Sequence, residues 1–198
     1  MYKIAGEQLP CVFDVSARTV ATQSLNIFGD HSDVYACRQT GFAMLCETNP
    51  QEVMDLSPVA HLATIEGKVP FINFFDGFRT SHEIQKIEKW DYADLKEMCN
   101  MGAVAAFRAH ALNPEHPAMR GSHENGDVFF QHREACNTAY NELPAIVEKY
   151  MAKVNEKLGT NYDLFNYYGA EDAERVIVAM GSVNDLSLIH ISEPTRPE

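Results

Sequence analysis

Hydrophobic residues along the chain form short runs of strand length, which are separated by longer amphipathic segments. An alternation of strand-length and helix-length segments is typical of consecutive βα units, which assemble into parallel sheets. The sequence therefore predicts an α/β fold with a parallel sheet flanked by helices. Four apolar runs are predicted as strands: Cys11–Val15, Asp33–Cys37, Val69–Phe75 and Val176–Met180.

The clearest helix signals follow the second of these runs. Asn49 is a favourable N-cap, proline follows it at the first helical position, and Glu52 stands at the third. Apolar residues then recur on one face, so a helix is expected over residues 49–66. Pro58 lies inside this segment and lacks an amide donor, so it should kink the helix or divide it in two near Leu56.

Two further helices are predicted from signals at their ends. The tetrapeptide Thr80–Glu83 has the spacing of a capping box, which indicates a helix that begins at Ser81. Pro144–Leu158 is amphipathic and is followed by Gly159, a residue suited to the left-handed conformation at a helix end. Ala111–Asn141 is rich in Pro, Gly, Asn and His, so we expect a long irregular excursion over the surface.

Composition and charge narrow the class of protein. The 198 residues are 45% hydrophobic and 22% charged, as in ordinary globular proteins, and no apolar run approaches the roughly 20 residues of a membrane-spanning helix. The net charge is −12 and the 16 lysines and arginines are scattered, so no nucleic acid is expected as a partner. The first residues lack the basic and apolar regions of an export signal, which predicts a cytoplasmic location.

Cysteine and histidine spacing gives no support for a metal bound by this chain. The five cysteines are widely spaced and include no Cys-x-x-Cys pair, so we interpret them as reduced structural thiols. The eight histidines form no His-x-x-x-His or His-Glu-x-x-His pair. The predicted metal ligands in this chain are therefore none.

The most informative polar stretch directly follows the predicted strand Val69–Phe75. Ligands of open α/β sheets bind beyond the carboxyl ends of strands, and the Asp-Gly turn at residues 76–77 lies there. Four polar residues here carry atoms suited to acid–base or metal chemistry, although a turn and a helix cap are the favoured explanation of them. These groups are Asp76, Arg79, His82 and Glu83.

Arg18 occupies the equivalent position after the predicted strand Cys11–Val15. Its guanidinium could hold a small carboxylate through two parallel hydrogen bonds, although a structural ion pair is the commoner role of an arginine. Two polar segments, 29–33 and 38–41, have the composition of loops at the mouth of a cleft, or of turns stabilised by Asp side chains.

These segments together resemble pyruvate:ferredoxin (flavodoxin) oxidoreductases. The resemblance extends from Met1 to about Asn184 and implies a thiamin diphosphate-binding fold, present in incomplete form. It also implies oxidative decarboxylation of pyruvate to acetyl-CoA and CO₂, with reduction of ferredoxin or flavodoxin. The motifs that carry it are Pro10–Arg18, Ile27–Asp33, Arg38–Leu45 and Phe74–Lys86.

The resemblance assigns a substrate role to Arg18. Val15–Arg18 matches the family motif whose arginine binds the pyruvate carboxylate. Family members often carry His where this chain has Asp14, and an unbroken strand would place Asp14 on the same face as Arg18, where it would compete with substrate. Further residues expected to line the site are Asp30, His31, Arg38, Gln39, Asp76 and Arg79.

The resemblance also implies groups that this chain would not hold alone. The whole enzyme would use thiamin diphosphate, Mg²⁺, [4Fe-4S] clusters and CoA, and would form a homodimer. The activating Glu and a substrate-binding Thr would precede residue 1, and the diphosphate domain and cluster ligands would follow the last residue. No catalytic residue is therefore predicted in this chain, which we expect to be inactive by itself.

The resemblance divides the chain into three parts. Residues 1–165 would be a partial pyrimidine-type domain, and residues 166–185 a linker and the first strand of a second α/β domain, similar to the transketolase C-terminal domain. Residues 186–198 resemble a translated sequencing adapter, and we expect them to be disordered or loosely docked. Two alternatives remain open: another 2-oxo acid:ferredoxin oxidoreductase, or a non-catalytic binding or assembly module.

Overall fold

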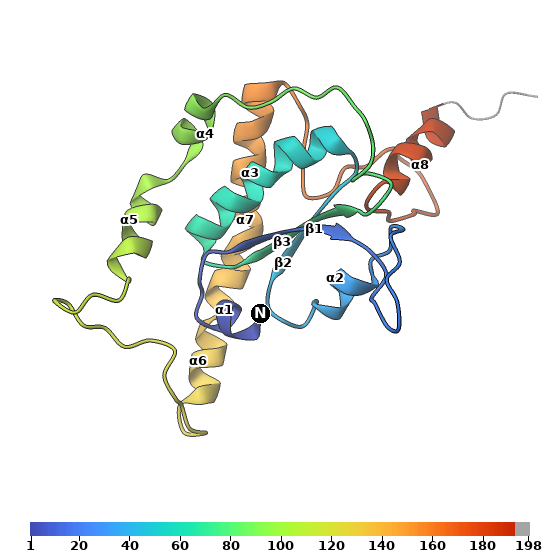
Figure 1. Ribbon diagram of the computed structural model, residues 1–198. Helices are drawn as coiled ribbons and strands as arrows, with labels where there is room; N and C mark the ends of the chain where they lie inside the picture. Colours follow the sequence, from blue (N-terminus) through green and yellow to red (C-terminus); the bar gives the residue numbers. More distant parts are fainter. Residues whose placement is uncertain (193–198) are drawn as a thin grey trace, which may run out of the picture.

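A three-stranded parallel sheet lies at the centre of the computed structural model, which describes residues 1–192 (Figure 1). The strands are β1 (Val12–Ala17), β2 (Ala43–Glu47) and β3 (Phe71–Asp76), in the order β1-β3-β2. Phe71 of β3 is in register with Val12 on one side and with Ala43 on the other. The predicted α/β fold with a parallel sheet is confirmed, and all three strands end at the same edge.

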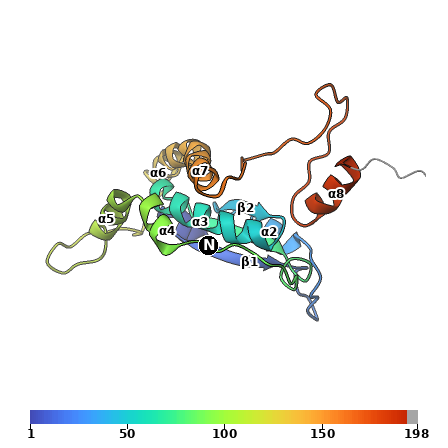
Figure 2. The same cartoon turned by 90° about the horizontal axis from the view of Figure 1, so that it is seen from above.

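Two long helices cover one face of the sheet (Figure 2). They are α3 (Pro50–Gly67) and α7 (Asn137–Leu158), which pack against each other as well as against the strands. Tyr150 of α7 is fully buried in the core between them, together with Phe71 of β3. Burial of this apolar layer is the main source of stability for the fold.

The opposite face is covered by two short helices, α1 (Tyr2–Gly6) and α2 (Ser32–Ala36). Phe74 of β3 and Val34 of α2 are buried in this smaller core. Because both faces of the sheet are covered, its strands are apolar along much of their length, as is usual in parallel sheets.

The helix expected over residues 49–66 is confirmed as α3. The Asn49 side chain accepts hydrogen bonds from the amides of Gln51 and Glu52, and Lys68 ends the helix in the left-handed conformation at φ 56°. Pro58 does not divide the helix, which runs uninterrupted from Pro50 to Gly67. The expected division is wrong because burial of this helix against the sheet and α7 compensates for the lost hydrogen bond.

The predicted strand Asp33–Cys37 is wrong, because this segment forms α2. Its polar residues bond to the backbone around it: Asp33 accepts from the Arg18 amide at 2.9 Å and Ser32 from the Val20 amide at 3.0 Å. Asp33 also accepts a local hydrogen bond from the Val34 amide at 2.6 Å, and local side-chain bonds to the backbone compete with strand pairing. The second strand is β2, whose sequence was not recognised as a strand.

The predicted helix that begins at Ser81 is also wrong. Residues 81–90 contain no helix, and the Ser81 hydroxyl accepts a hydrogen bond from the Phe78 amide at 2.8 Å within a turn. Ile84 is completely exposed at 101%, so no apolar face would be buried by a helix there. The next helices are α4 (Tyr92–Met98) and α5 (Met101–Ala109).

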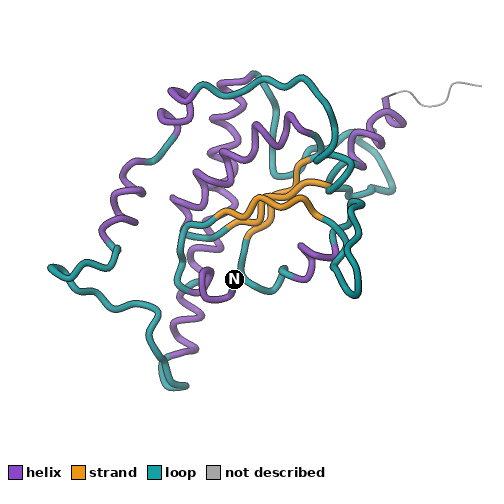
Figure 3. Tube along the Cα trace, in the orientation of Figure 1, coloured by secondary structure: helices purple, strands orange, loops and turns teal. Residues whose placement is uncertain are grey.

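The surface excursion is shorter than expected. Residues 110–128 are irregular and extend away from the sheet, but α6 (Phe129–Ala135) and the first residues of α7 fall within the segment predicted as irregular (Figure 3). The predicted start of a helix at Pro144 is therefore wrong, because α7 begins seven residues earlier, at Asn137. The predicted end is confirmed, since Gly159 caps α7 in the left-handed conformation.

The predicted strand Val176–Met180 does not form. Val176, Ile177 and Val178 are 63%, 90% and 85% exposed, and no strand of residues 1–192 lies beside them to accept their backbone hydrogen bonds. The chain continues into α8 (Val183–Ser192), so residues 186–192 are helical and, of the two expected alternatives, disorder does not apply to them. The last six residues of the predicted tail lie outside the described part.

Candidate functional site

The carboxyl edge of the sheet brings together most of the polar residues singled out in the sequence. β1 ends at Ala17, β3 at Asp76 and β2 at Glu47, and α8 lies beyond this edge (Figure 1). The loop after β1 folds back on itself through an isolated antiparallel bridge between Arg18 and Gly29. The parallel register thus places three strand ends and this loop around one position.

Asp76 is the centre of the polar contacts at this edge. One carboxylate oxygen lies 2.6 Å from His31 Nε2, and the other accepts hydrogen bonds from the Ser182 amide at 2.9 Å and from the Ser182 hydroxyl at 2.5 Å. Burial raises the pKa of Asp76, but the bonds from Ser182 and His31 outweigh it and hold the pKa below its ordinary value. Asp76 is therefore an ionised acceptor, and His31 is placed to donate to it.

A glycine allows the close approach of residue 182 to this carboxylate. Gly181 has φ +78°, and a Cβ there would lie 2.9 Å from Asp76 Oδ1. A larger residue would push Ser182 away from Asp76. Neither residue was recognised as part of the site from the sequence, because they are more than 100 positions from Asp76 and only the fold brings them together.

Arg18 lies directly over the turn that follows Asp76. A Cβ on Gly77 would be 2.4 Å from Arg18 Cγ and 2.7 Å from its Nε, so the arginine side chain packs against the glycine backbone. Arg18 Nε is buried and has no hydrogen-bond partner among residues 1–192. The guanidinium also has no carboxylate within salt-bridge distance in this part of the chain. Arg18 thus offers a cationic donor that the described residues do not neutralise.

The expected competition from Asp14 is not found. Asp14 accepts a hydrogen bond from Asn73 Nδ2 at 2.9 Å, and its other oxygen lies 4.0 Å from His61 Nε2. Asp14 stands inside β1 on the face that also carries Ser16, whereas Arg18 follows the strand and turns over Gly77. The even spacing did not keep the two residues on one face, because the strand ends at residue 17.

The other four predicted site residues lie in different places. Asp30 is exposed, and hydrogen bonds from Ser32 lower its pKa, so it acts as a local cap. Arg38 donates to the Tyr35 carbonyl at 2.9 Å and lines an apolar cavity of about 240 Å³. Gln39 lies before β2, at the opposite end of the sheet, and Arg79 is exposed on the turn. The structure therefore brings Arg18, His31 and Asp76 together, but not these four.

Glu47, at the end of β2, was missed in the sequence. It is completely buried, and neither carboxylate oxygen has a hydrogen-bond partner among residues 1–192. Burial raises its pKa well above the ordinary value, and the nearby charges of Glu52 and Asp14 add to the shift. Recognition of β2 would have placed Glu47 on the same face as Leu45 and Ala43, which are partly buried and pack against the large core.

The described part of the chain shows neither a metal cluster nor a membrane span. Within residues 1–192, no three His, Cys, Asp or Glu side chains are grouped so that they could hold a metal ion. No helix there has both the length and the apolar character needed to cross a membrane. At the sheet edge, the Arg18 guanidinium can bind an anion, and His31 and Asp76 share a hydrogen bond.

Comparison with known proteins finds a family model that matches most of the chain. Residues 1–152 match the family model described as pyruvate flavodoxin/ferredoxin oxidoreductase, thiamine diphosphate-binding. This match covers well over half of the chain. The chain belongs to this family, and the matched part is its thiamin diphosphate-binding domain.

Individual relatives are similar over nearly the whole chain. Pyruvate-flavodoxin oxidoreductase of Enterobacter agglomerans is 63% identical over 183 residues, and pyruvate:ferredoxin oxidoreductase of Moorella thermoacetica is 59% identical over 182. A pyruvate dehydrogenase [NADP(+)] of Cryptosporidium parvum is 53% identical over 182 residues. Each alignment covers 92% of this chain but only 16%, 16% and 9% of the respective relative. The chain thus spans about a sixth of the length of the first two.

Proposed function

We propose that this chain forms one wall of the substrate site in an enzyme that oxidatively decarboxylates pyruvate, with Arg18 as the residue that binds the substrate carboxylate. The activity belongs to a longer protein of the kind seen in the relatives, and the chain by itself would not turn over substrate. The 2-oxo acid would sit at the carboxyl edge of the sheet, where Arg18 lies close to the Asp76 turn.

One observation carries this proposal: the Arg18 guanidinium lies beyond the end of β1 with no anionic partner among residues 1–192. A buried guanidinium nitrogen without an acceptor is costly, and a carboxylate that accepts two parallel hydrogen bonds would satisfy it. The Gly77 backbone fixes the direction of the side chain, because any larger residue would displace it. A small, planar, anionic substrate matches this arrangement.

The His31–Asp76 pair would support the same site. Asp76 holds the imidazole through a 2.6 Å contact, while the Ser182 bonds hold the carboxylate. This arrangement fixes the orientation of the imidazole at the sheet edge. Thiamin diphosphate, bound in the complete enzyme, would supply the electron sink at the 2-oxo carbon.

Several finer statements belong to the proposal and rest on family membership. The complete enzyme would hold Mg²⁺, [4Fe-4S] clusters and CoA through residues other than these, would be a cytoplasmic homodimer, and would pass electrons to ferredoxin or flavodoxin. The name of the Cryptosporidium relative includes NADP(+), whereas the other two names include flavodoxin or ferredoxin, and the electron acceptor of this enzyme is therefore part of the proposal. We also propose that residues 166–185 lead into a second α/β domain.

The test is replacement of Arg18 by leucine in the full-length enzyme. Loss of two charge-assisted hydrogen bonds should lower kcat/KM for pyruvate by about a hundredfold or more, since each contributes roughly 1.5–3 kcal/mol. Arg108→Leu is the matched control, because Arg108 is an exposed arginine on α5. Unchanged pyruvate oxidation in Arg18→Leu, with bound thiamin diphosphate intact, would refute the role of Arg18.

The alternative of another 2-oxo acid as substrate is addressed by the same enzyme. Turnover should be compared for pyruvate, 2-oxobutyrate and 2-oxoglutarate at equal concentrations. A preference for pyruvate would support the proposal, and a preference for a longer acid would replace the substrate but retain the role of Arg18. Absence of turnover on all three, in an enzyme loaded with its cofactors, would favour the non-catalytic binding module.

A further inference from the structure

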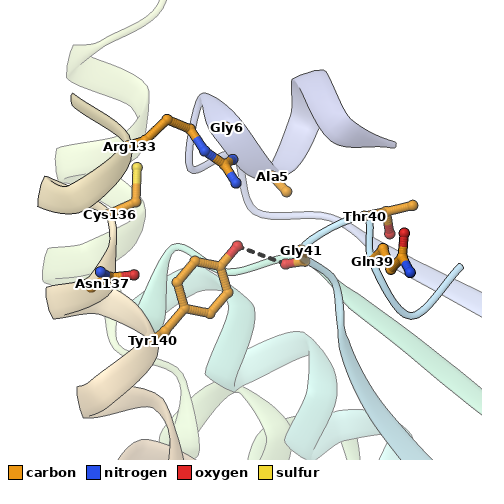
Figure 4. A pocket seen from close by; sticks show the side chains of 9 residues that line it. All are labelled: Ala5, Gly6, Gln39, Thr40, Gly41, Arg133, Cys136, Asn137 and Tyr140. Carbon is orange, nitrogen blue, oxygen red and sulfur yellow. Dashed lines mark hydrogen bonds between the residues drawn. The ribbon is translucent and has the colours of Figure 1, made fainter. Parts of the chain in front are cut away.

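A small cavity lies at the other end of the sheet, away from Arg18 and Asp76. It has a volume of about 130 Å³ and lies between α1, the turn that precedes β2, and the junction of α6 with α7 (Figure 4). Nine residues line it, and none of those nine is an aspartate or a glutamate. The whole chain has a net charge of −12, whereas the lining of this cavity contains no negatively charged side chain.

Segments that are far apart in the sequence pack closely against each other in the wall of this cavity. The Tyr140 hydroxyl of α7 donates to the Gly41 carbonyl at 2.8 Å. Gly41 has φ +88°, and a Cβ there would lie 2.7 Å from the Tyr140 hydroxyl oxygen and 2.9 Å from the Ala5 Cβ. The backbone around the cavity is therefore held in place, as a binding site requires.

The one charged group in the lining is Arg133, in the last turn of α6. Its guanidinium extends toward the space between α6 and α1 (Figure 4) and has no hydrogen bond or ion pair with any residue of 1–192. The amides of Gln39 and Asn137 line the same space, and that of Asn137 also donates to Glu134 at 3.2 Å. The cavity thus combines the Arg133 guanidinium, which is unpaired within the described residues, with the side-chain amides of Gln39 and Asn137.

We propose that this cavity binds a small oxyanion, of the carboxylate or phosphate type, with Arg133 as its principal ligand. A guanidinium presents parallel donors that match two oxygens of either group, and Gln39 can donate a further hydrogen bond. A volume of about 130 Å³ admits an anion of a few heavy atoms but not a nucleotide. The site is separate from the proposed substrate site and does not depend on it.

The experiment is an NMR titration of the ¹⁵N-labelled 198-residue chain with sodium phosphate and, separately, sodium acetate. Ionic strength is held constant with sodium chloride, which is also titrated alone. Saturable shifts are expected at the Arg133 Nε–H and at the amides of Gly41 and Asn137. Arg133→Gln should weaken binding about tenfold or more, because a charge-assisted pair is lost.

Two variants separate this site from other effects. Arg108→Gln removes an arginine outside the cavity and should leave the affinity unchanged. Arg18→Leu removes the guanidinium of the proposed substrate site and should also leave the shifts near Gly41 unchanged, so failure of one proposal does not imply failure of the other. The overall spectrum of each variant shows whether the fold is retained.

The outcomes are distinct. Saturation with phosphate alone, with acetate alone or with both would support the proposal and identify the oxyanion. Shifts that rise linearly without saturation, or equal shifts with chloride, would refute it. Binding that persists in Arg133→Gln with unchanged affinity would also refute it, because another residue would then hold the anion.

Discussion

Glu47 is completely buried and Glu66 is partly buried, and their surroundings shift their pKa values in opposite directions. Glu66, at the end of α3, accepts from Lys149 Nζ at 2.6 Å, from the Tyr150 hydroxyl at 2.6 Å and from Asn100 Nδ2 at 3.0 Å. Burial raises its pKa, but these donors lower it to about 2. Glu47 has no side-chain hydrogen-bond donor within the described residues, so burial, together with the nearby charges of Glu52 and Asp14, raises its pKa.

Within the described residues, the carboxylate of Glu66 is fully hydrogen-bonded, whereas buried polar groups near Glu47 lack hydrogen-bond partners. The Glu66 cluster joins α3 to α7 with every buried carboxylate oxygen bonded, as buried polar groups in stable interiors are. The sheet near Glu47 also holds Ser16 Oγ and Asn73 Oδ1 without partners in the described part of the chain. Unsatisfied polar groups gather close to the candidate site and not at the helix pair, which agrees with a functional origin.

Replacement of Glu66 should have the largest effect on stability. Glu66→Gln removes the charge that three donors share, and we expect the free energy of unfolding to fall by about 2–3 kcal/mol. The lowered pKa means that this contribution is present above about pH 4.5 and is lost as the pH falls toward about 2. Urea denaturation of both proteins between pH 2 and pH 7 measures the difference.

The control for this prediction is Glu142→Gln, an exposed glutamate in the first half of α7. It should change the free energy of unfolding by less than about 0.5 kcal/mol. A loss in Glu66→Gln that stays constant from pH 7 to pH 2 would contradict the proposed origin in the ionised carboxylate.

Replacement of Glu47 should act in the opposite direction. Glu47→Gln removes an ionisable group whose charged form is penalised, and we expect the protein to gain about 1–2 kcal/mol at pH 7. A raised pKa contributes stability below about pH 4.5, and this contribution is lost as the pH rises toward the pKa in the folded state. The gain from glutamine should therefore be absent at pH 4 and grow with pH.

The same urea series, extended to pH 8, measures this gain. If Glu47→Gln is as destabilising at pH 7 as Glu66→Gln, the carboxylate of Glu47 has a donor in solution and the comparison fails. A gain at every pH, including pH 3, would show that protonation is not its cause.

Removal of one donor from the Glu66 cluster should have a smaller effect than replacement of Glu66 itself. Tyr150→Phe deletes only the hydroxyl, so the packing of the buried ring is retained and a loss of about 1–2 kcal/mol is expected. The pKa of Glu66 should rise above about 2 in this variant, which carboxyl NMR shifts report. Tyr92→Phe, at a tyrosine that is 86% exposed, is the control. An unchanged Glu66 pKa would show that Tyr150 contributes little to the shift.

Local signals predicted some elements correctly and misplaced others. α3 was identified because Asn49, the following proline and the periodic apolar face are contiguous signals. The segment of α2 was assigned to a strand because its apolar residues are compatible with either structure over five positions, and β2 was overlooked beside it. The helix expected at Ser81 failed because a capping signal without a buried apolar face does not stabilise a helix.

The sequence likewise predicted some residues of the candidate site and missed others. The sequence indicated Arg18 and Asp76, since both directly follow apolar runs that form strands. It did not indicate Ser182 or Glu47, and it grouped Gln39 with the site although Gln39 lies at the other end of the sheet. Residues that are close in the sequence can lie at opposite ends of a sheet when a helix and a turn separate them. Hydrophobic periodicity does not show such a change of direction.

By itself, the sequence determined the α/β class, the covered parallel sheet, the family and the two strand ends that carry Arg18 and Asp76. These follow from contiguous patterns, in which neighbours along the chain are also neighbours in space. Only the tertiary structure decided that Ser182 binds Asp76, that Asp14 turns away from Arg18, and that Glu47 is buried without a donor. Those contacts join segments far apart in the chain, and their geometry depends on how every element between them packs.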